Sequence, residues 1–312
     1  MRRSDFDITD KIRTTDPIEV CDRTLDLFRA LYPDGNPRPM QRAFADLSQL
    51  YHGKHPDYHA CDTEYHDIQH VLDVTLAMAR LLDGYQRDRT ENAPLSPELF
   101  NVGIVTALFH DVGYLRRRND HKHRFGAEYT LTHVGRGSKF LRGYLPHIGL
   151  KRHAADASVL VHFTGYERDA DTIRMDDPLL RRIGEILGSA DIIAQMSDRC
   201  YLEKCHDRLY PEFVLGGIAR RKMPDGTVKV VYKSGKVLLS KTPAFYVNAM
   251  KRLDDKLHRA YYYAETHFGG ENLYIVEMEK NAAHATAAIS ASGRSRLRRA
   301  PPKTGADTLV IP

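Results

Sequence analysis

Apolar residues recur at helical spacing along most of this chain, beginning close to its N-terminus. Asp16 followed by Pro17 is typical of a helix start, with the aspartate as N-cap and the proline in the first turn. The apolar residues behind them share one face of that helix: Ile18, Cys21, Leu25 and Phe28. Up to about residue 60, the pattern predicts two packed helices that act as a scaffold.

Two helices in the middle of the chain carry polar residues of chemical interest. One is predicted over residues 67–83, where apolar side chains repeat with helical period and Gly84 closes the element. The next begins near residue 96 and its apolar residues run directly into His110 and Asp111. The pattern therefore places this His-Asp pair at a helix C-terminus.

Further helices follow in the second half of the chain. Residues 124–142 and 152–163 are predicted to be helical, and residues 178–196 form a stronger amphipathic pattern with an aspartate before it as N-cap. Asp191 lies on the buried face of that last helix. Helix is also predicted over residues 243–267, where apolar residues recur every four positions.

One segment departs from the helical pattern. In residues 221–239, Val228, Val230 and Tyr232 alternate with other residues between turn-forming Pro-Asp-Gly and Ser-Gly, which predicts a small β-hairpin insertion. The fold class is therefore all-α with one β-hairpin. We expect an N-terminal helical scaffold over residues 1–60, a main domain over 61–280, and a disordered basic tail over 281–312, where Ala, Ser, Arg and paired prolines dominate.

Composition and charge narrow the class of protein. The 312 residues are 42% hydrophobic and 28% charged, enough to bury a sizeable core. The net charge is +5, of which residues 281–312 supply +4, so we expect no nucleic-acid binding by the folded domain. The chain offers neither an apolar run long enough for a membrane span nor a secretory signal, so we expect no membrane partner and a cytoplasmic location.

Histidines and carboxylates point to a metal site. Of 16 histidines, 12 lie between residues 52 and 162. His66 and His70 are four residues apart, so both rings face one side of a helix. His110 and Asp111 add a nitrogen and a carboxylate. Asp191 adds a carboxylate on an otherwise apolar face, where an unpaired charge is costly and a bound metal removes that cost.

Several motifs resemble those of a known superfamily. His70, "FHDVG" at 109–113 and "SADI" at 189–192 resemble the H…HD…D signature of the HD-domain superfamily of metal-dependent phosphohydrolases. More narrowly, "YHDIQHVLDV" at 65–74 resembles the "YHNxxHAxDV" motif of class I cyclic-nucleotide phosphodiesterases, and "ADIIAQMSDRCYLEK" resembles the segment around their last metal-binding aspartate. The match covers about residues 65–210 and implies a helical bundle of the HD and phosphodiesterase type.

The resemblance assigns roles to the matching residues. It implies that His70, His110, Asp111 and Asp191 hold a first divalent metal ion and that Asp111 bridges to a second. It also implies that His66 is the general acid that protonates the leaving oxygen. A metal-bridging water then attacks phosphorus, and an imidazole with a pKa near 6.5 suits proton delivery at physiological pH. The ligand types suit Zn, Mn, Mg or Fe, and one or two ions.

The chain also departs from the phosphodiesterase pattern. Tyr114 stands where those enzymes carry a further histidine, and no glutamine follows Gln195 to match their purine-binding one. Many HD hydrolases have another ligating histidine shortly before a Gly-Ala pair, and His123, with His121 as second choice, resembles it. His162 resembles the next such histidine, so His123 and His162 are candidate ligands of a second metal.

Two arginines complete the candidate site. Arg116 and Arg117 follow the HD pair closely, and a guanidinium suits a substrate phosphate, although a solvated turn is the alternative interpretation. The sequence thus predicts a metal-dependent phosphohydrolase that acts on a nucleotide-like small molecule, and it favours a phosphodiesterase over a monophosphatase. Two alternatives stay open: a di-iron oxygenase of the HD fold, which requires both His123 and His162 as ligands, and a non-catalytic nucleotide-binding regulatory domain.

Overall fold

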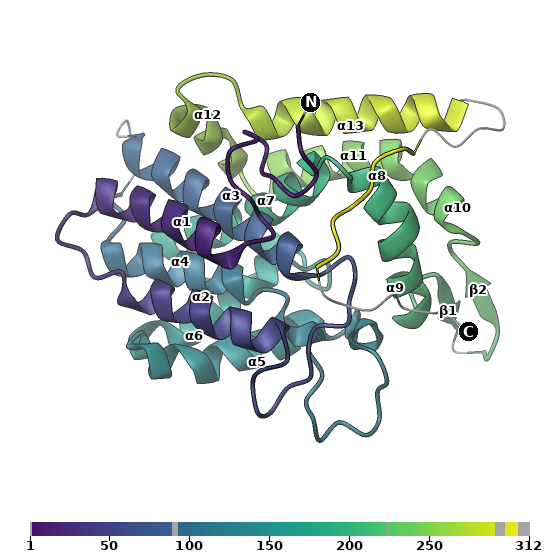
Figure 1. Ribbon diagram of the computed structural model, residues 1–312, viewed down its shortest axis with the longest axis horizontal. Helices are drawn as coiled ribbons and strands as arrows, with labels where there is room; N and C mark the ends of the chain where they lie inside the picture. The colour runs from purple at the N-terminus through teal and green to yellow at the C-terminus, as the bar shows by residue number, and fades with distance from the viewer. Residues whose placement is uncertain (1, 89–92, 224, 291–296, 305–312) are drawn as a thin grey trace.

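The computed structural model describes residues 2–88, 93–223, 225–290 and 297–304 (Figure 1). Within these ranges the chain is mostly helical and its one sheet is a two-stranded hairpin, which confirms the predicted fold class. No helix in the described ranges is long and apolar enough to cross a membrane.

Two long helices form the centre of the molecule. Helix α3 spans Ile68–Arg87 and helix α7 spans Pro178–Ser197, and the two pack against each other. Each begins at an aspartate, as the sequence predicts: the side chain of Asp67 accepts a hydrogen bond from the His70 amide, and that of Asp177 from the Leu179 amide. The caps fix where each helix begins, and the packing of α3 on α7 fixes the side chains on the two helices relative to each other.

The N-terminal helices continue the same hydrophobic core. Helix α1 spans Pro17–Leu31 and packs on α3, and helix α2 spans Arg38–Tyr51 and packs on α4, which spans Pro97–Leu108. The start of α1 at Asp16 agrees with the sequence. The buried face of α1 differs from the predicted one at one position: Ile18 is 70% exposed, and Val20 is buried instead.

The middle of the chain is more broken than the periodicity predicts. Helix α5 spans His133–Tyr144, and the residues before it form only a short 3-10 turn at Gly126–Tyr129. Helix α6 spans Ala154–Leu160 and is followed by a 3-10 turn at Val161–Phe163. Helix α3 in contrast continues past Gly84: a Cβ at that glycine would lie 1.8 Å from the Tyr263 carbonyl oxygen, so the glycine serves close packing and is no helix stop.

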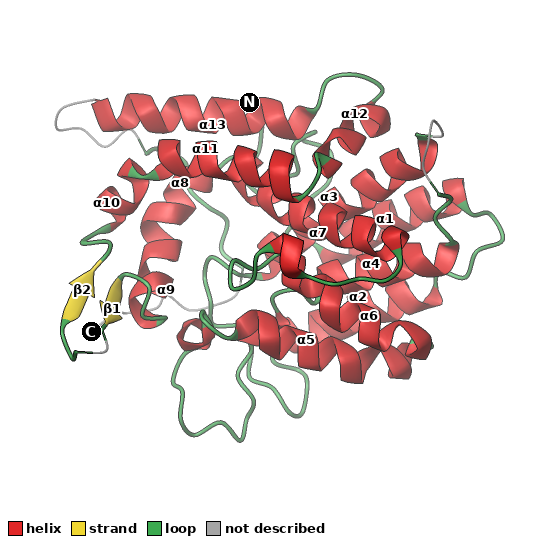
Figure 2. Ribbon diagram, turned by 180° about the vertical axis from the view of Figure 1, so that it is seen from behind, coloured by secondary structure: helices red, strands yellow, loops and turns green. Residues whose placement is uncertain are grey.

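The hairpin lies where the sequence places it but is shorter. Strand β1 spans Arg220–Lys222 and pairs antiparallel with β2, which spans Val228–Val230. Residues 235–239, expected to belong to the hairpin, instead form helix α10, Gly235–Ser240, because the Ser234 side chain caps it by accepting from the Val237 amide. In both Figure 1 and Figure 2 the hairpin lies at one end of the molecule beside α9, Tyr210–Leu215, and α10.

The helix predicted over residues 243–267 is interrupted. Helix α11 ends at Lys251, a π-helical turn follows, and His258 and Arg259 have φ angles of 45° and 57°, which a right-handed helix cannot accommodate. Contacts from α7 stabilise the break, since Arg182 donates to the His258 carbonyl and the His258 ring lies 2.9 Å from Glu185. The remaining short helices are α8 (Tyr201–Lys204), α9 (Tyr210–Leu215), α11 (Thr242–Lys251) and α12 (Tyr263–Phe268).

Part of the C-terminal region that the sequence predicts to be disordered is ordered in the structure. Helix α13 spans Leu273–Ser290, and Asn281 within it donates to the Met196 and Asp198 carbonyls. Residues 297–304 lie along the fold, where the Glu203 side chain accepts from two backbone amides and Thr304 donates to Asp67. These polar contacts hold a segment whose composition alone is typical of disorder. The rest of the predicted tail, residues 291–296 and 305–312, lies outside the described residues.

Candidate metal centre

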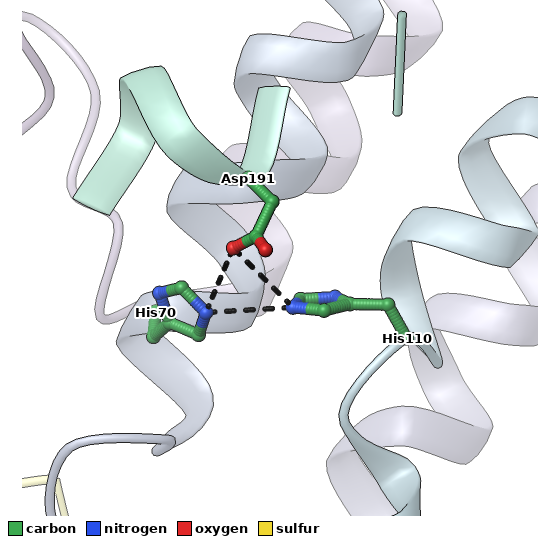
Figure 3. Close-up of side chains that lie close together, drawn as sticks. All are labelled: His70, His110 and Asp191. Carbon is green, nitrogen blue, oxygen red and sulfur yellow. Dashed lines mark hydrogen bonds and ion pairs between the residues drawn. The ribbon is translucent and has the colours of Figure 1, made fainter. Parts of the chain in front are cut away.

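Three side chains from distant parts of the chain meet at one point (Figure 3). The Nε2 atoms of His70 and His110 lie 3.4 Å apart, and Asp191 Oδ1 lies 3.5 Å from the first and 3.9 Å from the second. Two imidazole nitrogens and a carboxylate oxygen within 4.8 Å of one another could hold a metal ion.

The surrounding structure positions each of these side chains. His70 lies in the first turn of α3, and Asp191 lies on α7 with 14% of its side chain exposed. His110 follows the last residues of α4, and its Nδ1 lies 2.7 Å from the Ala107 carbonyl oxygen. Donation from Nδ1 to that carbonyl leaves Nε2 as the atom that faces the cluster.

Asp111 supplies a second carboxylate at the same point. Its Oδ2 lies 3.2 Å from His110 Nε2 and 3.4 Å from His70 Nε2. Among the described residues this buried oxygen has no hydrogen-bond partner. An orphaned carboxylate oxygen facing two imidazole nitrogens is costly unless a cation lies between them. The residues present therefore fit a divalent metal.

The electrostatics of the cluster favour positive charge. Burial alone would lower the pKa of His110, but the neighbouring charges of Asp111 and Asp191 outweigh it and raise the pKa to about 9. Burial alone would raise the pKa of Asp111. The histidines around it nevertheless hold this pKa well below its usual value. The field that stabilises a proton here also stabilises a metal ion, which would take the proton's place.

His66 lies beside the cluster in a hydrogen bond with a carboxylate. Its Nδ1 is 2.5 Å from Oε2 of Glu212 on α9, and the other oxygen of Glu212 accepts from the Tyr65 amide at 2.6 Å. Burial alone would lower the pKa of His66, but the charge and hydrogen bond of Glu212 raise it above its usual value. Glu212 thus orients the ring and favours its protonated form. No short-range pattern in the sequence links it to His66.

A stack of rings connects His66 to a histidine that the sequence analysis did not single out. Tyr114 stacks on His66 at 4.4 Å and on His133 at 4.3 Å between ring centroids. His133 Nε2 lies 3.6 Å from Asp111 Oδ1, and burial lowers the pKa of His133, which favours the neutral ring that binds metals. One signal in the sequence was available, because His133 shares a helical face with the buried Gly137 and Leu141.

The structure does not bring His123 to this cluster. Its Nδ1 lies 3.1 Å from Asp120, and its ring packs on Tyr129 at 4.3 Å. Because the loop that carries it folds on itself around Asp120, His123 lies outside the cluster, and this arrangement gives its predicted role as a second-metal ligand no support. The ligand set that the di-iron alternative requires is therefore incomplete.

Arg116 and Arg117 are engaged elsewhere as well. The Arg116 guanidinium lies 3.0 Å from Asp62, which also accepts from the Gly126 amide, and Arg117 lies over the Tyr58 ring. Neither arginine lines the cavity that contains the metal cluster. Both side chains therefore stabilise the loop, and this arrangement gives the predicted contact with a substrate phosphate no support.

His162 is buried close to the cavity but does not line it. Its Nδ1 lies 2.7 Å from Glu167 Oε1, and Glu167 does line the cavity. Burial alone would raise the pKa of Glu167, but the hydrogen bond to His162 holds it below its usual value. His162 therefore contacts a carboxylate that lines the cavity.

The cluster opens into a cavity of about 480 Å³. His66, His70, Asp111, His133 and Asp191 line one part of it, and the other walls are mainly aromatic and aliphatic. Among the polar lining residues, Gln195 accepts from the Tyr65 hydroxyl at 3.2 Å, and Lys241 is exposed. The main lining side chains outside the cluster are Tyr65, Tyr114, Tyr166, Tyr201, Phe213, Tyr232 and Phe245.

The fold defines a class: it is the fold of phosphodiesterase domains. The chain superposes with a TM-score of 0.51 on the phosphodiesterase domain of the RhoPDE fusion protein from the choanoflagellate Salpingoeca rosetta, at 12% identity, covering 92% of this chain and 95% of that one. A second structure, the phosphodiesterase domain of Salpingoeca rosetta rhodopsin phosphodiesterase, gives the same TM-score, identity and share of this chain, and covers 91% of its own. A scan of the sequence against known protein families gives no match, and a search of curated proteins gives none.

Proposed function

We propose that this protein is a metal-dependent phosphodiesterase that hydrolyses a phosphodiester bond in a nucleotide-like small molecule. The observation that carries the proposal is the convergence of His70, His110, Asp111 and Asp191 on one buried point, with an orphaned Asp111 oxygen among them. The likeness of the fold to phosphodiesterase domains supports it.

In this proposal, His70, His110, Asp111 and Asp191 would hold a divalent ion, which would acidify a bound water and neutralise charge on the phosphoryl oxygens. His133 and the second oxygen of Asp111, 3.6 Å apart, are the candidates for holding a second ion. Asp111 would then contribute to both positions, since Oδ2 lies near His70 and His110 and Oδ1 lies near His133. His162 acts on the site through Glu167, the cavity-lining carboxylate to which its Nδ1 is hydrogen-bonded.

His66 is the proposed general acid. It lines the cavity beside Asp111, and Glu212 holds its Nδ1, so Nε2 is the atom free to carry a proton to the leaving oxygen. Tyr114 stacks on the ring and restricts its rotation. Loss of the proton as the alcohol departs leaves a neutral imidazole hydrogen-bonded to Glu212.

The aromatic walls of the cavity suit a planar or apolar group attached to the phosphodiester, as in a nucleotide. A cavity of about 480 Å³ falls in the range that accommodates a small-molecule substrate. We therefore place the scissile phosphate at the metal cluster and the remainder of the substrate against the tyrosine and phenylalanine side chains.

The test is a panel of phosphodiesters: cyclic nucleotides, cyclic dinucleotides and a generic aryl phosphodiester, with nucleoside monophosphates for comparison, each assayed with Mn, Mg, Zn or Fe. The proposal predicts hydrolysis that depends on an added divalent ion and is abolished in Asp111→Ala. The control Asp120→Ala removes a carboxylate of the same region that lies outside the cavity, so it should retain activity. Equal hydrolysis by wild type and Asp111→Ala would contradict the proposal.

A further inference from the structure

The excess of basic over acidic residues in the fold is concentrated in one short segment. Residues 220–241, the hairpin and the helix after it, contain seven Lys and Arg and one acidic residue, Asp225, for a net charge of +6. Because the whole chain carries +5 and residues 281–312 carry +4, the remaining residues, 1–219 and 242–280, carry −5. The folded domain therefore carries a basic segment on a body that is otherwise net negative.

The charged side chains of this segment are free to meet a partner. Six of the seven are described as exposed, and none of these six forms an ion pair within the described part of the chain. Structural charge networks do form elsewhere in this protein, for example between Arg80 and Asp7. The six exposed basic residues are Arg220, Arg221, Lys229, Lys233, Lys236 and Lys241.

The same hairpin exposes aliphatic side chains. Val228, Val230 and Val231 are 59%, 46% and 41% exposed. Arg220 pairs with Val230 across the hairpin, so these two residues and Val228 share one face of it. One side of the hairpin thus combines apolar side chains with a cation whose long stem can lie along them.

The hairpin also lies next to the candidate site. Figure 2 shows it at the end of the molecule, clear of the main helical body. Tyr232 and Leu238, from the same segment, line the cavity, and Leu131 and Tyr166, which also line it, are 69% and 62% exposed. A surface that contacts the hairpin would therefore lie close to the apolar rim of the cavity.

We propose that the segment 220–241, with its exposed valines, docks this protein on an anionic lipid bilayer. Four to eight basic residues next to apolar side chains are what a peripheral contact with acidic lipid requires, since the cations attract the headgroups and the aliphatic groups enter the interface. Single-stranded nucleic acid is recognised through exposed aromatic rings, which the described residues of the hairpin strands lack. Such docking needs no membrane span, and it revises the expectation that the protein has no membrane partner.

The test is co-sedimentation of the full chain with vesicles of phosphatidylcholine alone or mixed with phosphatidylserine. Each basic residue at such a surface strengthens partitioning by about fivefold, so Arg220→Gln/Arg221→Gln/Lys229→Gln should weaken binding to the mixed vesicles by at least about tenfold. Val228→Ser/Val230→Ser should weaken it by several-fold, and high salt should release the wild type. A matched control removes three exposed cations from α5 and the turn after it: Lys139→Gln/Arg142→Gln/Lys151→Gln.

The result expected is binding to the acidic vesicles that is weakened in both hairpin variants and unchanged in the control. All variants should keep the wild-type melting temperature and hydrolysis of a soluble phosphodiester, so the outcome is independent of the proposed activity. Binding that does not depend on phosphatidylserine, or that the control loses equally, would overturn the proposal. Retention of a single-stranded RNA in a mobility shift, lost in the charge variant but not in the valine variant, would assign the surface to nucleic acid instead.

Discussion

The hydrogen bond between His66 and Glu212 makes the proposed acid step testable with one isosteric substitution. Glu212→Gln removes the charge from a carboxylate that is fully buried and whose Oε2 lies 2.5 Å from His66 Nδ1. A hydrogen bond to a charged group contributes about 1.5–3 kcal/mol, and every 1.4 kcal/mol is a factor of ten. We therefore expect kcat to fall roughly 10- to 150-fold.

The pH profile gives a second readout with a defined sign. Glu212 holds the pKa of His66 above its usual value, and the acid works only while protonated, so activity falls as pH rises through that pKa. Removing the carboxylate lowers the pKa, so the descending limb of kcat against pH should move to lower pH. The assay is kcat over a pH series with the divalent ion saturating.

The control for this variant is Glu185→Gln. Glu185 is a buried glutamate on α7 that pairs with Arg181 and Arg182 and does not line the cavity. Its substitution should lower the melting temperature without moving the descending limb of kcat against pH. A Glu212→Gln enzyme with wild-type kcat and an unmoved limb would refute the assignment of His66 as the acid.

Three further predictions follow from the geometry. The affinity for a divalent ion should rise by about tenfold per pH unit up to about pH 9, because the metal displaces the proton from His110, whose pKa is raised to about 9. Isothermal titration with Mn over a pH series measures this affinity, and a flat profile would contradict the assignment of His110 as a ligand. Gly84→Ala should destabilise the protein by about 1–3 kcal/mol or more, since its Cβ would meet the Tyr263 carbonyl at 1.8 Å, whereas Gly143→Ala, with nothing within 4 Å, should be neutral or stabilising in a thermal melt. Arg117→Gln should change kcat/KM for an anionic phosphodiester by less than about twofold, because the side chain lies on Tyr58 outside the cavity; a tenfold loss would return Arg117 to the substrate site.

The elements that the sequence predicts well are those with a local cause. The starts of α1, α3, α4 and α7 are marked by a capping residue, and these helices carry apolar faces of regular period. His70 and Asp191 lie on two of these helices, so their approach could be expected once the helices pack. Ile18 shows the limit of this reasoning, since an apolar side chain in the stripe is exposed at the end of its helix.

The residues that sequence reasoning missed depend on contacts between distant segments. Glu212 lies 146 positions from His66, and His133 meets Asp111 only because α5 packs on the turn after the His-Asp pair. Gly84 has the composition of a helix stop but lies within α3, where another backbone passes against it. Residues 297–304 are held by side chains of the main domain. The composition of the segment itself contains no information about these distant partners.

The central claim is that one metal centre, built from His70, His110, Asp111 and Asp191, performs phosphodiester hydrolysis. The most direct measurement is to strip the purified protein with a chelator, add back Mn in steps, and follow bound metal and aryl phosphodiester hydrolysis in parallel for wild type and Asp191→Ala. Activity should return in proportion to bound metal in the wild type, and the variant should lose both. Full activity after stripping, or an active Asp191→Ala protein that binds no metal, would contradict it.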